Sequence, residues 1–226
     1  MPHTGNWLVD ALPRTERVAI AQSADRVPLG VGDILGRPGD AIERVYFPTA
    51  GVVSALAVLA DGRSVETAMI GRDGGVGLVP GAGSGRSRAL LKVQIAGEAL
   101  AISLKSFQTL AGHSAAMRAA ILEHADNMHQ QTVQAAACNA LCSAETRIAR
   151  WLLMCRDRID EDVVPLRQDE LALTLGLQRT TVTAAARALQ GRGLIEYSRG
   201  RIQILNPAGL VDATDGCYQP AGQGRV

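Results

Sequence analysis

Arginine and threonine side chains gather in the stretch 166–205, and both types can recognise nucleic acid. The stretch holds six arginines, no lysine and three acidic residues, a local charge of +3 in a chain whose net charge is +1. Arginine can form paired hydrogen bonds with a guanine edge or a phosphate, and threonine can bond to bases or backbone. Charge alone does not identify a polyanion partner, so the spacing of the apolar residues matters.

That spacing is typical of two short helices that cross steeply. Counting Gln168 as the first position, Ala172 is fifth, Gly176 is ninth and Val182 is fifteenth. A small residue is needed where the backbones approach, a glycine where the turn requires positive φ, and a branched apolar residue to lock the crossing. The pattern predicts a helix-turn-helix. The alternative is an ordinary pair of helices with a solvated face.

The second of these helices, expected from 178 or 179 to 190, presents a short polar face without acidic residues. A helix that enters a DNA major groove needs such a face. Apolar and polar residues then alternate on both sides of Ser198-Arg199-Gly200, which predicts a basic β-hairpin able to touch phosphates. The residues that we expect to contact DNA are Gln168, Gln178, Arg179, Thr180, Thr181, Thr183, Arg187, Arg199 and Arg201.

A long helix is expected before this motif, because 114–143 contains neither proline nor glycine and is rich in alanine. Residues spaced alternately four and three apart form a seam typical of two helices packed along their length. We interpret it as a homodimer interface, and the alternative is a helix that lies on its own domain. The seam consists of Ile121, Ala125, Met128, Thr132, Ala135 and Asn139, continuing to Cys142.

The four cysteines lie late in the chain and form no disulfide framework pattern. Cys138 and Cys142 stand one helical turn apart and could bind a metal ion if ligands from elsewhere joined them. We interpret them instead as small packing residues and predict no metal site.

Other function classes lack their signatures. The chain has no dinucleotide fingerprint, nucleophile elbow or paired-histidine metal motif, so we predict that it is not an enzyme. No apolar run approaches the about 20 residues that cross a bilayer, and the first ten residues do not resemble a signal peptide. We therefore expect a cytoplasmic protein with no membrane partner.

Residues 27–105 have the pattern of β structure, with short apolar runs separated by turn signals such as Asp61-Gly62. Strands, a long helix and a winged helix-turn-helix together predict an α+β fold. The expected domains are a β-roll over 1–112, a dimerisation helix over 113–143, a winged helix-turn-helix over 144–210 and a flexible tail over 211–226.

This order of parts resembles the cyclic-AMP receptor/fumarate–nitrate regulator (Crp/Fnr) family of bacterial transcription regulators, over about residues 10–206. The segments that carry the resemblance include Pro38-Gly39-Asp40, Val45-Tyr46-Phe47, Gly74 to Leu78 and Thr146-Arg147-Ile148-Ala149, besides the helix-turn-helix. The resemblance implies a cyclic-nucleotide-binding-like jelly roll and a homodimer that binds an inverted repeat in double-stranded DNA. It also implies RNA polymerase as a partner. The alternative function is a cyclic-nucleotide-responsive module that acts through protein partners.

The resemblance also implies a small-molecule pocket in the β-roll. Where cyclic-nucleotide-binding members place a glutamate on the ribose hydroxyl, this chain has Gly75, which removes a hydrogen bond worth about 1.5–3 kcal/mol. The effector is therefore unknown, and cyclic AMP is not expected in the usual pose. Iron–sulfur members use cysteines near the N-terminus, and none precedes Cys138, so no cluster is expected. The pocket residues would be Gly74, Gly75, Val76, Gly77, Leu78, Arg86, Ser87, Arg88 and Thr132.

Overall fold

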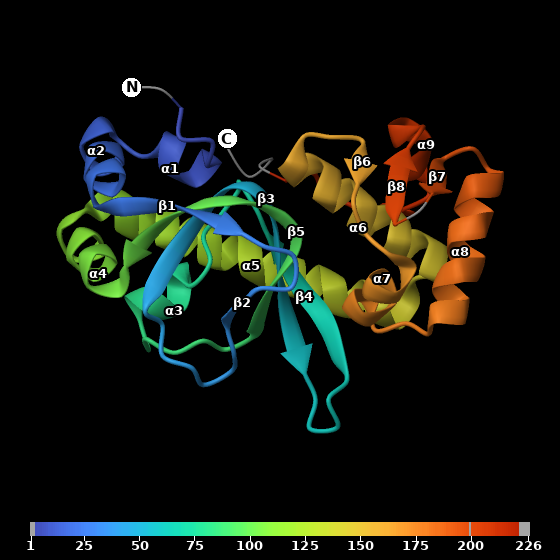
Figure 1. Ribbon diagram of the computed structural model, residues 1–226, viewed down its shortest axis with the longest axis horizontal. Coiled ribbons are helices and arrows are strands. Elements are labelled where there is room, and N and C mark those ends of the chain that lie inside the picture. Colours follow the sequence, from blue (N-terminus) through green and yellow to red (C-terminus); the bar gives the residue numbers. More distant parts are fainter. Residues whose placement is uncertain (1–2, 199, 222–226) are drawn as a thin grey trace. The chain divides into compact units, whose positions relative to one another are not determined.

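The computed structural model describes residues 3–198 and 200–221, and its elements follow the predicted order (Figure 1). Strands come first, then a long helix, then a helix-turn-helix with a small sheet, so the α+β class is confirmed. The chain divides into two units. The first comprises 1–55 and 68–131, and the second comprises 56–67 and 132–226.

Strands β1 to β5 form the sheet that gives the first unit its frame, and β1 and β2 run antiparallel to β5. The strand order is β1-β5-β3-β4, and β2 also pairs with β5. The β1–β5 register runs from Ala24 opposite Ile102 to Leu29 opposite Gly97. The strand bounds are β1 Ala24–Leu29, β2 Ile34–Gly36, β3 Arg44–Val58, β4 Ser64–Ile70 and β5 Leu90–Ser103.

Helices bury the apolar residues of this sheet. One core cluster contains Val9, Ile20, Phe47, Phe107 and Ile121, which come from four different helices and from β3. Burial of this kind stabilises the unit by about 25 cal/mol for each Å² of apolar surface removed from water. The helices are α1 Trp7–Ala11, α2 Arg14–Ser23, α3 Leu78–Ala82, α4 Leu104–His113 and α5 Ala115–Leu141.

A fully buried asparagine fastens the N-terminal segment to the sheet. The side-chain amide of Asn6 donates to the carbonyls of Pro48 (2.8 Å) and Gly74 (2.9 Å), and its oxygen accepts from the Val9 N–H at 3.0 Å. Because a buried polar group without partners is costly, these three bonds fix the loop around Gly74 as well as the start of α1.

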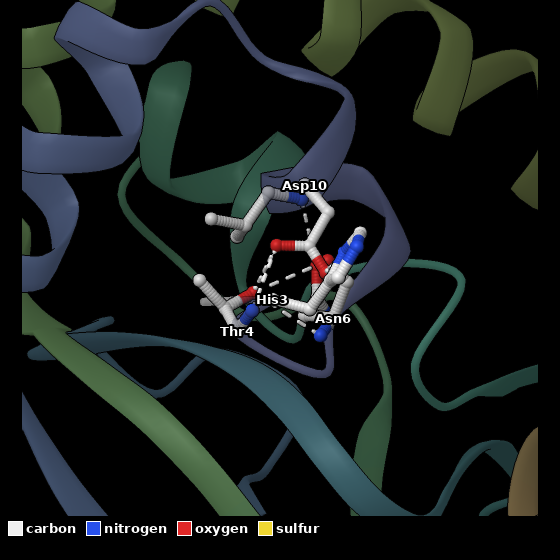
Figure 2. Close-up of polar contacts among 5 residues, drawn as sticks. His3, Thr4, Asn6 and Asp10 are labelled. Atoms are coloured by element: carbon white, nitrogen blue, oxygen red, sulfur yellow. Dashed lines mark hydrogen bonds and ion pairs between the residues drawn. The ribbon is translucent and has the colours of Figure 1, made fainter. Parts of the chain in front are cut away.

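A second contact in the same segment joins Thr4 to Asp10 (Figure 2). The backbone N–H and the hydroxyl of Thr4 both donate to Asp10 Oδ1, at 2.8 and 2.9 Å, and His3 Nδ1 lies 3.4 Å from Asp10 Oδ2. Burial acts to raise the pKa of Asp10, but these hydrogen bonds outweigh it and hold the pKa below its ordinary value.

The long helix α5 exposes only part of the predicted seam. Ile121 is only 7% exposed within the single chain and Ala135 only 8%, while Met128 is half-buried against a core cluster of the first unit. Thr132 and Asn139 are exposed, and Ala125 is half-buried. Part of the seam is thus covered within the single chain, as the alternative interpretation expects, and its role in a dimer stays a prediction.

The second unit contains the helix-turn-helix and a three-stranded sheet of order β6-β8-β7. Buried Ile148, Trp151 and Leu152 of the first helix, α6, supply much of its core. Its elements are α6 Ala144–Ile159, β6 Val163–Val164, α7 Gln168–Leu175, α8 Arg179–Gly191, β7 Ile195–Ser198, β8 Arg201–Ile204 and α9 Pro207–Asp212.

The structure differs from the predicted flexible tail over 213–221. Ala213 and Thr214 are buried, and the Tyr218 hydroxyl donates to Asp157 Oδ1 at 2.8 Å. The Ala221 N–H donates to Asp157 Oδ2 at 2.9 Å, and burial together with the Asp157 contact raises the pKa of Tyr218. Polar composition predicted disorder, but a carboxylate on α6 satisfies these polar groups. Residues 222–226 lie outside the described part of the chain.

None of the helices in the described ranges is both long enough and apolar enough to cross a membrane.

Candidate nucleic-acid interface

The helix-turn-helix has the geometry that its spacing predicts. Gly176 ends α7 with φ of 61°, a conformation that costs other residues about 1–2 kcal/mol, and the Leu177 N–H closes the turn on the Ala172 carbonyl at 2.9 Å. Ala172 on α7 and Val182 on α8 are buried, as predicted. The other buried residues of the two helices are Leu171, Thr174, Leu175, Ala185, Ala186 and Leu189.

An arginine on α6 forms a hydrogen bond to the end of α7, next to this turn. The Arg147 guanidinium donates to the carbonyl of Leu175, the last residue of α7. A cation at a helix C-terminus interacts favourably with the helix dipole. Burial lowers the pKa of Arg147 from its ordinary value. The sequence marked Arg147 only as part of a matching segment, because nothing in it shows which carbonyl a long side chain reaches.

The second helix exposes the predicted polar face. Gln178, Arg179 and Arg187 are exposed on or beside α8, as are Thr180 and Thr181. Thr183 is half-buried, and its hydroxyl lies within hydrogen-bond distance of Gln168 Oε1 (2.8 Å) and the Arg179 carbonyl (2.9 Å). The Gln168–Thr183 contact links the start of α7 to the middle of α8, so Gln168 acts partly in orienting the two helices.

The N-terminal ends of both helices open into one cleft of about 380 Å³. Gln168 and Arg179 were expected to contact DNA, and the structure brings them together here with Arg167 and Tyr197. Asp169 and Gly200 complete the lining. Backbone N–H groups at helix N-termini favour anions, so a phosphate suits the chemistry of this cleft. Sequence reasoning missed Arg167 and Tyr197 because they come from a loop and from β7.

The β7–β8 hairpin provides the predicted wing. Its register places Ser198 opposite Arg201 and Ile195 opposite Ile204, so one side is apolar and buried. The Tyr197 N–H donates to Gln190 Oε1 at 3.1 Å, which connects the wing to α8. Arg201 is exposed on β8, whereas Arg199 lies outside the described residues.

The glycine-rich loop expected to hold an effector is buried in the first unit. A Cβ on Gly75 would lie 3.3 Å from a ring carbon of Phe47, and one on Gly74 would lie 2.4 Å from the ring of His124. Val76 and Leu78 are buried, as is Gly77. A side chain at position 75 would therefore press on the core.

The remaining expected pocket residues have different surroundings. The Arg86 guanidinium is exposed and donates to the Gly39 carbonyl at 2.8 Å, while the buried Ser87 hydroxyl donates to the Ala89 carbonyl at 2.8 Å. Arg88 is exposed, and Thr132 is an exposed residue of the second unit.

Comparison with known proteins identifies the DNA-binding part. Residues 146–213 match the family model of the Crp-like helix-turn-helix domain. FixK2 from Bradyrhizobium japonicum has 19% identity and a TM-score of 0.71, over 84% of this chain and 96% of that chain. Residues 146–213 thus form a Crp-like helix-turn-helix domain, and the chain shares the fold of these regulators. This domain makes the chain a DNA-binding transcription regulator.

Two further solved structures share the fold. TTHA1359, a Crp/Fnr-family transcriptional regulator from Thermus thermophilus, has 21% identity and a TM-score of 0.67, over 84% of this chain and 98% of that chain. The c-di-GMP-responsive global regulator CLP from Xanthomonas campestris has 20% identity and a TM-score of 0.66, over 83% of this chain and 97% of that chain. A search among proteins of curated function found no match.

Proposed function

We propose that this chain is a Crp/Fnr-type regulator that acts as a homodimer and reads an inverted-repeat operator through α8. The observation that carries the proposal is the exposed, acid-free face of α8, with Arg179 at its start beside a polar cleft. Two symmetry-related helices of this kind fit half-sites about 34–36 Å apart, one turn of DNA. Because a transcription regulator must reach DNA, we also propose that the protein is cytoplasmic. RNA polymerase would be its protein partner.

Different arginines should have different roles in this interface. Arg179 stands at the N-terminal end of α8, from which recognition helices reach base edges. Arg201 is exposed on the wing strand β8, where phosphates are the natural ligand. Arg179 should therefore contribute to sequence preference, and Arg201 to affinity for any duplex.

The test begins with selection of operators from random duplex DNA, followed by affinity measurements over a range of salt concentrations. Arg179→Ala should weaken the free energy of binding to the selected DNA by about 1–3 kcal/mol and relax the sequence preference at one base pair. Arg201→Ala should weaken selected and random DNA alike and reduce the salt slope by about one. Arg26→Ala on β1 is the matched control, and it should change neither the affinity for DNA nor the salt slope. Equal losses on both DNAs for Arg179→Ala would refute this division of roles, and salt-independent or absent binding would favour action through protein partners.

The dimer contact that we propose is the solvent-facing side of α5. Eight exposed residues follow one another at alternating spacings of four and three, one position after the residues of the predicted seam. Leu122 is 71% exposed and Val133 is 55% exposed. The coiled-coil period is thus retained, and only its register differs. We define this outer stripe as Ala115, Ala119, Leu122, Asp126, His129, Val133, Ala136 and Ala140.

The effector should not be cyclic AMP in its usual pose, because Gly75 has no carboxylate and its surroundings in the core leave little room for one. The similar regulator CLP is c-di-GMP-responsive, so cyclic dinucleotides are candidates as well. Calorimetric titration with cyclic AMP, cyclic GMP and cyclic di-GMP tests this. Tight binding of cyclic AMP would contradict the proposal.

A further inference from the structure

Three cysteines that are distant in sequence converge in the second unit. Cys138 lies in the last turn of α5, Cys142 directly follows that helix, and Cys217 lies in the segment after α9. Their Sγ atoms all lie within 4.8 Å of one another, and those of Cys142 and Cys217 are 3.1 Å apart. The sequence supplied the first two and left open whether a ligand from elsewhere joins them. The fold brings the third.

Specific contacts hold Cys217 in this position. The Cys217 N–H donates to the Thr214 carbonyl at 2.9 Å, and the Asp215 carboxylate accepts from the Thr146 hydroxyl at 3.1 Å. On the other side, the bond from Tyr218 to Asp157 fastens the chain to α6. Because anchors lie on both sides of Cys217, its approach to Cys142 follows from the packing of the whole segment.

Two arginines and a helix N-terminus lie beside the cluster. Cys142 directly precedes Ser143, the N-cap of α6, and a helix N-terminus stabilises a nearby negative charge. The Gln134 side-chain amide donates to Cys138 Sγ at 3.4 Å. Arg147 also interacts electrostatically with Cys138 and Cys142.

We propose that Cys138, Cys142 and Cys217 bind one thiophilic metal ion through their three sulfur atoms. Zinc–sulfur bonds of about 2.3 Å place tetrahedral ligands about 3.8 Å apart, so each sulfur would need to shift by about 1 Å or less. Thiolate sets select soft ions such as Zn²⁺ and Cu⁺, and a water molecule can complete a three-sulfur site. A disulfide would use only two of the sulfurs and would not account for the convergence of the third.

The direct test is titration of the full chain with Cd²⁺, a probe whose thiolate complexes absorb in the ultraviolet. The chain is first fully reduced and kept free of oxygen. One Cd²⁺ should bind per chain with a sulfur-to-metal charge-transfer band, and Zn²⁺ should compete. Loss of outer-shell partners alone costs 10–100-fold in metal affinity, so Cys217→Ser and Cys142→Ser should each weaken binding by about tenfold or more.

Cys155→Ala is the matched control, because Cys155 is a buried cysteine of α6 outside the cluster. It should bind Cd²⁺ with unchanged affinity and stoichiometry. Zn²⁺ should also raise the melting temperature of the unaltered chain but not that of Cys217→Ser, whose metal-free melting curve shows whether the variant folds.

Absence of the charge-transfer band in the reduced chain would overturn the proposal. The same holds for a Cys217→Ser variant that folds and binds Cd²⁺ with unchanged affinity. Failure of the reduced chain to bind Cd²⁺, combined with ready oxidation of Cys142 and Cys217 to a disulfide, would assign the cluster to thiol chemistry instead. No DNA is present in these measurements, so their outcome is independent of the proposed operator binding.

Discussion

The register of α5 can be tested with two neighbouring residues that should respond in opposite ways. Ile121 is 7% exposed and belongs to the core cluster of the first unit, whereas Leu122 is 71% exposed. Truncation of a buried Ile to Ala costs about 2–5 kcal/mol, because it removes apolar contacts and leaves a cavity. Ile121→Ala should therefore lower the free energy of unfolding of the single chain by this amount.

Leu122→Ala should instead act on association. Full burial of a leucine side chain is worth about 1.5–3 kcal/mol, and the exposed part of Leu122 is what a partner helix can still cover. We expect a loss of about 1–2 kcal/mol per copy and about 2–4 kcal/mol per dimer. The dissociation constant of the dimer should then rise about 30- to 1,000-fold. The free energy of unfolding of the single chain should change by less than about 0.5 kcal/mol, as for an ordinary surface substitution.

The assays are sedimentation equilibrium for association and urea unfolding at one low, fixed concentration, since dimer formation adds concentration-dependent stability. Val133→Ala, at another exposed position of the outer stripe, should behave like Leu122→Ala with a smaller effect. The proposed register of α5 is refuted if Ile121→Ala dissociates the dimer without destabilising the chain while Leu122→Ala leaves the dimer intact. A monomeric unaltered chain would refute the homodimer proposal itself.

Three further predictions concern stability. Asn6→Ala should lower the free energy of unfolding by about 2–4 kcal/mol in urea, because it leaves three buried backbone groups without their partner; an unchanged value would contradict the contacts of Asn6 with Pro48, Gly74 and Val9. Gly176→Ala should lower the free energy of unfolding by about 1–2 kcal/mol, because Gly176 has a positive φ. Gly191 lies at the end of α8 with open space around it, so Gly191→Ala should leave the free energy of unfolding unchanged or raise it. The pKa of Asp10 is lowered by folding, so its stabilising contribution is present above the ordinary value of 3.8 and is lost as the pH falls through the folded pKa. Asp10→Asn should therefore reduce the loss in the free energy of unfolding as the pH falls through the folded pKa of Asp10 in a stability–pH curve. An unchanged pH dependence would show that this carboxylate does not contribute to stability.

The helix-turn-helix could be predicted from the sequence because its requirements are local. Ala172, Gly176 and Val182 each meet a steric need that depends only on two adjacent helices, and the structure has them as predicted. The same is true of the wing, whose strands are joined by a short turn. The contributions of Arg167 and Tyr197 to the cleft were not predictable in this way, since they depend on how a loop and a strand pack beside α7 and α8.

The long helix shows where local reasoning ends. A spacing of four and three residues establishes a helical stripe, but two stripes one residue apart have the same period. Ile121 faces the core only because the sheet and helices of the first unit lie there, and Leu122 is left outside. Register is thus a property of the packing partner.

The sequence by itself determined the order of the elements, the helix-turn-helix and the charge of its outer face, because periodicity, glycine placement and arginine content act over short distances. Tertiary structure alone decided which side of α5 is free, that Gly75 faces the core, and that a polar tail packs on α6. It also brought Cys217 to Cys138 and Cys142. These features depend on contacts between residues far apart in the chain, and composition and spacing carry no record of such contacts.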